Sequence, residues 1–471
     1  MSKGRQRSTS RREFLRSTGR VATASAFLAA VTPRIHAAED NTIHVALVGC
    51  GGRGSGAAAN AMAAKGGPIK LYAMADLFAD RLQRSYKGLM EAASVPRTGG
   101  SADTWIMGHQ AEQIDVPPGR QFLGFDAYQK AIDCLRPGDV VILTTPVAFR
   151  WVHFRYAIQK GINVFMEKPV TVDGPSTRKM LELAEESERK NLKVGVGLMC
   201  RHCKARWELY DRIRSGQLGD LLTLRTYRQH GPVGFYGPNQ SSESELLWQI
   251  RGYLSFFWAS GGLFQDIIAH NVDECCWMKG SWPVRAQGSG GRCLRSGAVD
   301  QNFDHYDAEC TFADGTKLFL YVRAIAGCHG EFASYAHGTK GSAVISTHMH
   351  TPAKCRVYKG HDFVRSNLVW AFPQPEPNPY QLEWDHLIDA IRNDKLFNEA
   401  KRGTEAGLVT AMARRAVHTG QVVTYDEMLN SEEEFASNVD ALTMNSPAPV
   451  HLGPDGIYPT PQPGILKNRE Y

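Results

Sequence analysis

The sequence predicts an α/β fold in two parts: a doubly wound parallel sheet, then an α+β part with an open, mostly antiparallel sheet. Up to about residue 200, short apolar runs rich in Val and Ile alternate with helical stretches, which is typical of a parallel sheet. After residue 201, strand-like runs follow one another with few helices between them, which favours an antiparallel sheet. The chain has 471 residues, of which 43% are hydrophobic, and this length suffices for two domains with separate cores.

The individual elements follow from apolar runs and helical periodicity. For the parallel sheet we expect strands at 42–48, 69–75, 139–146, 161–166 and 193–199. Helices are expected after the first, third and fourth of these strands. For the second sheet we expect strands at 221–228, 307–312, 316–322 and 342–346, and near the end helices at 380–393 and 404–419. Residues 95–120 are expected to be a surface excursion and 431–471 an extended tail.

Residues 1–38 are typical of an export signal. Residues 10–16, SRREFLR, match the twin-arginine pattern, an apolar stretch follows at 21–31, and small residues offer cleavage sites up to residue 38. The pattern predicts export by the Tat machinery and a periplasmic location; the alternative is a basic, disordered N-terminus. Because the apolar stretch is too short to cross a bilayer and no later segment is long enough, we expect no membrane span.

The positive charge of the chain is concentrated in this leader. Its 38 residues hold eight Lys or Arg and one acid, so they account for the formal net charge of +6 and leave about −1 for the remainder. A nearly neutral chain behind a basic leader does not have the charge distribution of a nucleic-acid-binding protein. We therefore expect no nucleic-acid partner.

The ten cysteines do not form a recognisable metal or disulfide framework. Cys200 and Cys203 make a lone CxxC without a second pair at zinc-ribbon spacing, so we expect buried thiols and no metal site. A Cys200–Cys203 or Cys275–Cys276 disulfide formed after export would be strained.

A glycine-rich turn follows the first predicted strand. Gly49, Gly51 and Gly54 form a GxGxxG pattern that encloses Gly52 and Arg53, and a helix rich in small residues comes next. Such glycines allow a tight turn and let main-chain N–H groups reach a pyrophosphate at the helix N-terminus. The pattern is weak evidence alone, but its place between a strand and a helix makes it a strong indication of a dinucleotide site.

An acidic residue at the expected distance supports this interpretation. Asp76 follows the second predicted strand, 22 residues after Gly54. Its carboxylate would accept hydrogen bonds from ribose hydroxyls and would repel a 2′-phosphate, which favours NAD over NADP. The sequence therefore predicts an NAD-binding Rossmann domain over 40–200.

Glu167, Lys168 and Pro169 close the predicted strand at 161–166. In a dinucleotide-binding sheet, a Lys at the carboxyl end of this strand lies where the nicotinamide ring would lie. Its ammonium would polarise a substrate hydroxyl or carbonyl beside that ring.

A second group of reactive residues follows Gly261 and Gly262. Asp266 and His270 are four residues apart, so a helix would present both side chains on one face. A His with an ordinary pKa near 6.5 can take a hydroxyl proton as a hydride leaves the same carbon, and a nearby carboxylate can orient the imidazole.

Together these motifs resemble the Gfo/Idh/MocA oxidoreductases, the family of glucose–fructose oxidoreductase and inositol dehydrogenase. The resemblance covers nearly the whole chain, and its most specific parts are the Thr145-Pro146 strand end, Glu167-Lys168-Pro169 and residues 261–273. It implies a sugar, cyclitol or sugar-derivative substrate and a catalytic set of Lys168, Asp266 and His270. The cofactor-binding residues that follow from the fingerprint and the resemblance are Gly49, Gly51, Gly52, Arg53, Gly54, Asp76, Thr145, Pro146, Glu167 and Lys168.

The resemblance also implies features of the second part, over 201–430. Arg201 and His202 stand where relatives have a pair that faces the cleft, so they are candidates for substrate binding beside Asp266 and His270. Relatives commonly pair through the open face of this sheet, which implies a homodimer or homotetramer. Arg150 stands where relatives often carry His, and its charge would favour an acidic substrate group.

Export restricts the chemistry, because no pool of NAD exists outside the cytoplasm. The enzyme would have to hold its cofactor tightly and return it to its starting state in each turnover. One solution is ping-pong redox between a polyol or sugar and a second carbonyl compound. A second is an NAD-dependent glycosidase that works by transient oxidation and elimination, and a third possibility, of another class, is a non-catalytic sugar-binding protein.

Overall fold

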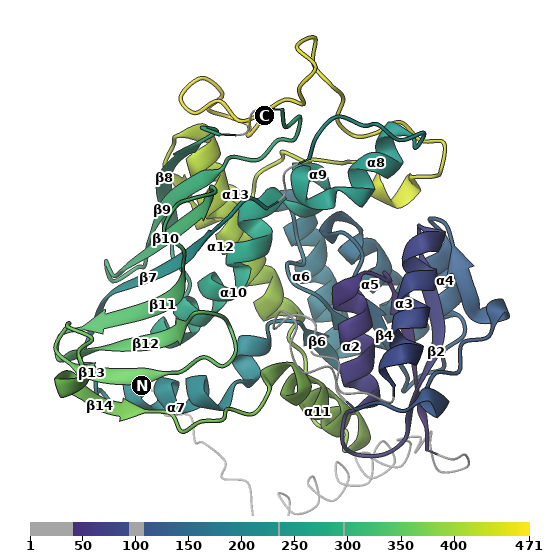
Figure 1. Cartoon of the computed structure of the whole chain (residues 1–471), viewed down its shortest axis with the longest axis horizontal. Helices are drawn as coiled ribbons and strands as arrows, with labels where there is room; N and C mark the ends of the chain where they lie inside the picture. The colour runs from purple at the N-terminus through teal and green to yellow at the C-terminus, as the bar shows by residue number, and fades with distance from the viewer. Residues whose placement is uncertain (1–40, 94–107, 234–235, 295–296) are drawn as a thin grey trace, which may run out of the picture. The chain divides into compact units, whose positions relative to one another are not determined.

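The structure, a computed structural model, describes residues 41–93, 108–233, 236–294 and 297–471. Its first sheet is six-stranded and fully parallel, in the order β3-β2-β1-β4-β5-β6 (Figure 1). The strands are β1 (Ile43–Val48), β2 (Ile69–Asp76), β3 (Gln121–Leu123), β4 (Val140–Leu143), β5 (Asn163–Met166) and β6 (Val194–Val196). This strand order is that of a dinucleotide-binding Rossmann sheet, with a topological switch point between β1 and β4.

Helices cover both faces of this sheet because successive side chains of a buried strand point to opposite sides. In β1, Val45 and Leu47 pack with one group of helices, whereas Ala46 and Val48 pack with the other. The first group is α2 (Gly52–Met62), α3 (Ala79–Ala92) and α11 (Pro379–Arg392), and the second is α4 (Ala127–Ile132), α5 (Arg150–Lys160) and α6 (Gly174–Arg189). Helix α11 thus returns from the far end of the sequence to complete the first domain.

The second sheet has nine strands in the order β14-β13-β12-β11-β7-β10-β9-β8-β15. All neighbouring strands are antiparallel except β7 and β10, so the predicted α/β and α+β fold class is confirmed. The strands are β7 (Leu221–His230), β8 (Arg285–Gly291), β9 (His305–Thr311), β10 (Lys317–Ala324), β11 (Glu331–Gly338), β12 (Gly341–Thr347), β13 (Arg356–Lys359), β14 (Leu368–Ala371) and β15 (Val423–Thr424).

One face of the second sheet packs on two long helices, α10 (Gly262–Lys279) and α12 (Ala400–Thr419). The remaining α-helices are α7 (Lys204–Arg214), α8 (Glu245–Arg251), α9 (Phe257–Ser260) and α13 (Tyr425–Leu429). Short 3-10 turns lie at Ala111–Gln113, Pro118–Arg120, Val147–Phe149, Met199–His202, Tyr253–Ser255, Arg365–Asn367 and Val439–Ala441. Strand β10 shows why the other face stays open: its buried and half-buried residues alternate along its whole length.

The segment after α13 is extended and is hydrogen-bonded to the rest of the molecule. Figure 1 shows it as the yellow trace beside α8 and α9. Gln249 donates a side-chain hydrogen bond to the Val450 carbonyl at 2.7 Å, and Gln301 donates one to the Pro459 carbonyl at 2.8 Å. Glu470 is fully buried.

Several expectations lie partly or wholly beyond the described residues. The leader at 1–38 is outside them, and so is the first half of the predicted excursion at 95–120. Because Ile43–Tyr471 form one compact unit, the domain bounds at 200 and 430 stay predictions. Within the described ranges, no helix is long and apolar enough to cross a membrane.

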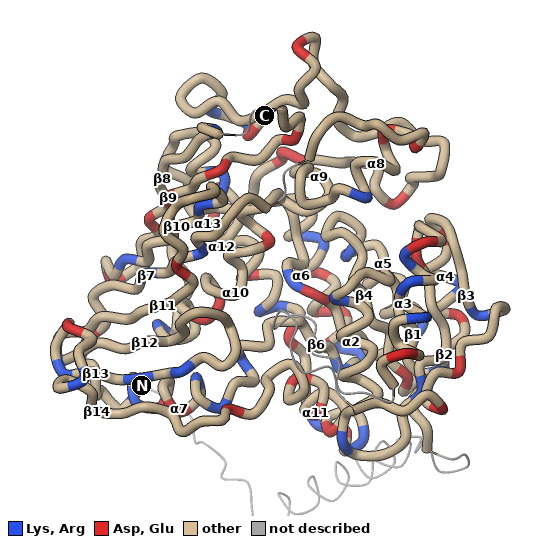
Figure 2. The backbone as a smooth tube through the Cα atoms, in the orientation of Figure 1, with Lys and Arg blue, Asp and Glu red and all other residues tan. Residues whose placement is uncertain are grey.

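The surface charges and the cysteines are described over the same ranges. Figure 2 shows Lys and Arg interspersed with Asp and Glu along the tube.

All ten cysteines carry free thiols, including the adjacent Cys275 and Cys276 and the nearby Cys200 and Cys203.

Candidate active site

A cavity of about 840 Å³ opens at the carboxyl edge of the parallel sheet, between that sheet and the second part of the chain. This volume is within the usual range for a small-molecule or cofactor site, about 300–1,000 Å³. Because β2, β1, β4 and β5 are neighbours, the residues that follow them meet along one wall. The predicted residues on that wall are Gly49, Gly51, Gly52, Arg53, Gly54, Asp76, Thr145, Pro146, Glu167 and Lys168, and Asp266 and His270 face them from α10.

The glycines of the turn between β1 and α2 have distinct steric roles. Gly49 has φ of +98°, and a Cβ there would lie 2.7 Å from the main chain of Thr144. A Cβ on Gly54 would lie 2.2 Å from the Gly49 carbonyl oxygen, so this glycine permits the close packing of α2 on the turn. By contrast, a Cβ on Gly51 or Gly52 would meet nothing within 4 Å, so open space lies beside the start of α2. A pyrophosphate fits such an open helix N-terminus.

Asp76 holds the glycine turn against the end of β2. Its Oδ2 accepts a hydrogen bond from the Cys50 N–H at 2.6 Å, and its Oδ1 accepts one from the Phe78 N–H at 2.8 Å. Burial raises the pKa of this carboxyl above its ordinary value, which these hydrogen bonds oppose. Each oxygen has a further lone pair, so Asp76 retains the capacity to accept a ribose hydroxyl in the cavity that it lines.

The loop after β4 is fastened on both sides. Thr144 Oγ1 donates to the Gly49 carbonyl at 2.6 Å, and the Arg150 guanidinium donates to the carbonyls of Leu143 and of Thr145, the latter at 3.0 Å. Arg150 is 2% exposed, and burial lowers its pKa to about 10. The Arg150 guanidinium is thus hydrogen-bonded to the main chain of the cavity floor. This arrangement does not support the expectation that Arg150 favours an acidic substrate group.

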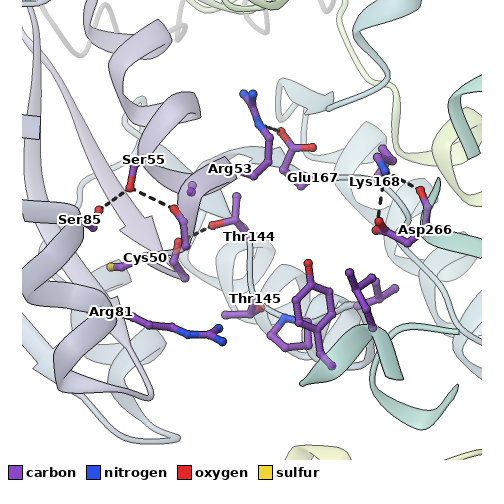
Figure 3. A pocket seen from close by; sticks show the side chains of 18 of the residues that line it. Cys50, Arg53, Ser55, Arg81, Ser85, Thr144, Thr145, Glu167, Lys168 and Asp266 are labelled. Atoms are coloured by element: carbon purple, nitrogen blue, oxygen red, sulfur yellow. Dashed lines mark hydrogen bonds and ion pairs between the residues drawn. The ribbon is translucent and has the colours of Figure 1, made fainter. Parts of the chain in front are cut away.

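Glu167 is paired with the first turn of α2. Its Oε1 accepts a hydrogen bond from Arg53 Nε at 2.7 Å (Figure 3). The Arg53 guanidinium also lies over the Tyr380 ring. A Cβ on Gly197 would lie 2.4 Å from Glu167 Oε2, so the position directly after β6 needs a glycine beside this carboxylate. The pair joins the end of β5 to the dinucleotide turn.

Lys168 and Asp266 point toward each other across the cavity, as Figure 3 shows. Lys168 Nζ donates to the Asp266 main-chain carbonyl at 2.7 Å and lies 3.7 Å from Asp266 Oδ1. Their side chains are 15% and 23% exposed, so both can reach a bound molecule. The carboxyl end of β5 and the first turns of α10 are therefore joined through an ammonium in the cavity.

His270 lies one helical turn after Asp266 and is 6% exposed. Burial, and then the charges of Lys168 and Arg228, hold its pKa well below the ordinary value of 6.5. Its ring lies 4.4 Å from the ring of His350, measured between centroids, and its Nδ1 has no hydrogen-bond partner among the described residues. At neutral pH this imidazole is uncharged, which is the state required of a general base.

Arg201 and His202 do not line the cavity, unlike the other predicted residues. Arg201 makes a bidentate pair with Asp273 of α10, at 2.8 and 2.7 Å. His202 is buried between His386, at 2.8 Å between Nδ1 atoms, and Glu399, at 3.2 Å. The polar contacts of Arg201 and His202 are therefore with neighbouring elements of the protein, which the two side chains hold together.

Sequence reasoning missed the residues that the second sheet and its neighbours bring to the cavity. These additional lining residues include Arg228, Tyr253, Phe332, Met349, His350 and Tyr380. The Arg228 guanidinium lies 3.8 Å from the Phe332 ring centroid, and the His350 ring packs edge-on against the same Phe. No short motif marks them, because they lie on strands, loops, a 3-10 turn and α11 that are far apart in the sequence and meet only in the folded chain.

The sequence is similar to known oxidoreductases, although no protein-family model matches it. It is 24% identical over 299 residues to scyllo-inositol 2-dehydrogenase (NAD(+)) of Bacillus subtilis, which covers 61% of this chain and 76% of the relative. It is 26% identical over 221 residues to a glycosyl hydrolase family 109 protein of Streptomyces coelicolor, over 46% of this chain and 40% of the relative.

Solved structures share the two-part fold. Aldose-aldose oxidoreductase from Caulobacter crescentus matches with a TM-score of 0.59 at 15% identity, over 81% of this chain and 99% of that one. Scyllo-inositol dehydrogenase from Lactobacillus casei, solved with NAD(H) and scyllo-inositol, matches with a TM-score of 0.57 at 19% identity, over 82% and 99%. The homologues and structural neighbours of this chain are thus inositol dehydrogenases and oxidoreductases of the Gfo/Idh/MocA type, which confirms the resemblance seen in the sequence.

Proposed function

We propose that the protein is an NAD-dependent oxidoreductase that acts on a CH–OH group of a sugar, cyclitol or sugar derivative. The observation that carries the proposal is the convergence of Lys168, Asp266 and His270 in the cavity that also holds the dinucleotide turn. The similarity to inositol dehydrogenases supports it.

The residues at the carboxyl edge suit NAD. Gly51 and Gly52 leave open space for the pyrophosphate at the start of α2, and Asp76 would accept the adenosine ribose hydroxyls. Thr145 and Pro146, with Glu167 and Lys168, would line the nicotinamide end of the site. When bound, NAD would accept a hydride from the substrate carbon and return it later in the turnover.

The three catalytic candidates then have separate tasks. His270, uncharged at neutral pH, takes the proton of the reacting hydroxyl. Lys168 donates a hydrogen bond to the same oxygen and stabilises the charge that develops there. Asp266, 3.7 Å from the ammonium, holds Lys168 in place and offers an acceptor to a neighbouring substrate hydroxyl.

We further propose that the cofactor is retained, because the twin-arginine pattern at 10–16 predicts a periplasmic enzyme without access to free NAD. A Tat-dependent periplasmic location would be tested by cell fractionation. Ping-pong redox between a polyol or sugar and a second carbonyl compound is the first candidate turnover, and the structural similarity to an aldose-aldose oxidoreductase supports it.

The second candidate is an NAD-dependent glycosidase. The glycosyl hydrolase relative supports it, and so does the contact between His270 and His350, because elimination needs proton transfers beyond the first oxidation. A non-catalytic sugar-binding protein is the alternative of another class. Such a protein would have no need of the Lys168 and His270 side chains that this chain retains.

The proposal is tested by the nicotinamide absorbance of the purified protein while sugars and glycosides are added without free NAD. We expect a stable rise that only a second carbonyl compound reverses, which establishes ping-pong redox. A small or transient rise with release of the aglycone would instead establish the glycosidase. No bound nucleotide, and no response even with added NAD, would contradict both and leave the sugar-binding protein.

We also propose that the protein is a homodimer or homotetramer paired through the open face of the second sheet. That face carries stacked aromatic side chains: the rings of Tyr227 and Tyr321 lie 5.0 Å apart, and Tyr335 packs against Tyr227. Half-buried aromatic residues on an exposed sheet face favour association. Light scattering of the purified protein is expected to give the mass of two or four chains, and a monomer mass would contradict the proposal.

A further inference from the structure

A fully buried ion pair connects the segment after Lys168 with the start of the helix that carries Asp266 and His270. Arg414 of α12 and Glu470 form this pair, and both are 0% exposed. Arg414 Nε donates to Glu470 Oε2, and Nη2 donates to Oε1, each at 2.8 Å. Two parallel hydrogen bonds of this kind define both the position and the plane of the guanidinium.

The remaining N–H groups of Arg414 bind the two segments that lead to the catalytic residues. Nη2 donates to the Val172 carbonyl at 2.9 Å, four residues after Lys168. Nη1 donates to the Gly261 carbonyl at 3.2 Å and to Gln265 Oε1. A guanidinium has five N–H groups, and all five are used here.

Gln265 makes a second connection between the same segments. It accepts from Arg414 through Oε1 and donates through Nε2 to the Thr171 carbonyl at 2.5 Å. Gln265 immediately precedes Asp266, and Thr171 follows Lys168 by three residues. Arg414 and Gln265 therefore connect the segment after Lys168 to the start of α10. The same two segments are joined in the cavity by the 2.7 Å hydrogen bond from Lys168 Nζ to the Asp266 carbonyl.

Glu470 is itself held on several sides. Its Oε2 accepts from His418 Nδ1 at 2.6 Å, and its main-chain N–H donates to Glu433 Oε1 at 2.7 Å. Burial alone would raise the pKa of this carboxyl, but Arg414 and His418 hold it down to about 2. Glu470 is therefore a charged, fixed counter-ion at neutral pH.

We propose that Glu470 is a positioning residue for the active site: through Arg414 it sets the distance between Lys168 and the first turns of α10. The inference rests on the proposed function and adds to it a residue outside the cavity. Without the Glu470 carboxylate, Arg414 is a buried charge without its counter-ion, and the groups around it have to rearrange to compensate. A displacement of about 1 Å between reacting groups can lower a rate by ~10²-fold.

The test compares Glu470→Gln and Glu470→Asp with a matched control, Glu274→Gln. Glu274 forms an equally buried pair with Arg206 of α7, at 2.7 Å, and accepts from Ser346 of β12 at 2.9 Å. It lies on α10 beyond His270, and its pair does not bond to the Lys168 segment. We expect Glu470→Gln to lower kcat by about 10- to 100-fold without changing the dissociation constant of NAD. Glu470→Asp, which keeps the charge, should restore part of the loss, and Glu274→Gln should retain the wild-type kcat even where its melting temperature falls.

A readout independent of activity separates this inference from the proposed function. Amide hydrogen exchange is expected to accelerate at 168–172 and 261–266 in Glu470→Gln and to stay unchanged there in Glu274→Gln. If the wild type turns over no sugar, the proposed function fails, whereas this exchange pattern would still establish the role of Glu470 in positioning. Unchanged exchange in those segments, or an equal loss of kcat in Glu274→Gln, would overturn the inference.

Should Glu470→Gln fail to fold, Gln265→Met offers a second route. That variant removes the bridge to Thr171 and leaves the Arg414–Glu470 pair in place. We expect the same faster exchange at 168–172 and a lower kcat, and wild-type values of both would overturn the inference.

Discussion

Replacement of Lys168 by Ala is expected to lower kcat by ~10²–10³-fold and to leave NAD binding unchanged. The ammonium donates to the Asp266 carbonyl at 2.7 Å and is the charged donor at the carboxyl end of β5, beside the proposed reacting oxygen. The residues proposed to bind the nucleotide pyrophosphate and ribose lie on the turn after β1 and at the end of β2, away from this side chain. Steady-state rates and nucleotide titration by protein fluorescence measure the two effects separately.

Two further variants define what this result means. Lys179→Ala removes a Lys that pairs with Glu434 at 2.7 Å outside the cavity, and it is expected to keep the wild-type rate. Lys168→Arg keeps the charge but replaces a compact ammonium with a planar fork, so it is expected to restore little of the rate. Wild-type turnover in Lys168→Ala would remove Lys168 from the proposed mechanism.

The parts of the site that the sequence predicts are those encoded by short segments. The glycine turn, Asp76 and the Glu167-Lys168 pair each follow a strand, and strands that pair in order bring their carboxyl ends to one edge. Asp266 and His270 are four residues apart on one helix, so their common orientation follows from helical geometry. For the same reason the fold class of both parts could be predicted from hydrophobic periodicity alone.

The parts that could not be predicted depend on contacts between distant segments. Arg201 faces Asp273, which is 72 residues away, and nothing near Arg201 indicates that partner. His350 reaches the cavity only because β12 pairs with β11 and thereby places the following loop beside His270. Arg414 and Glu470 are 56 residues apart, and the tail that carries Glu470 has no periodicity that would predict its place.

The rate of the enzyme as a function of pH is expected to reveal His270. Burial, with the charges of Lys168 and Arg228, lowers its pKa well below 6.5, so the imidazole stays uncharged as the pH falls through that value. The base is lost only when the pH falls below the depressed pKa. We therefore expect kcat/KM for substrate oxidation to show no loss of the base at pH 6.5, and its acid limb to lie at lower pH.

The acid limb has to be assigned to one of two neighbouring imidazoles. His350 lies 4.4 Å from His270 between ring centroids, and its pKa is also lowered, by burial and then by His270. Because such a pair titrates as a unit, the pH profile of the wild type alone does not distinguish them. His270→Asn is expected to lower kcat by ~10²–10⁴-fold and to abolish the limb, whereas His350→Asn should retain a limb.

A control outside the cavity completes the assignment. His386 is exposed and contacts His202, so His386→Asn is expected to keep both the rate and the acid limb of the wild type. If the limb persisted unchanged in His270→Asn and disappeared in His350→Asn, the base would be His350. Asp266 and Lys168 would then address a neighbouring hydroxyl, because Asp266 on α10 and Lys168 after β5 line the same cavity, in which His350 lies beside His270.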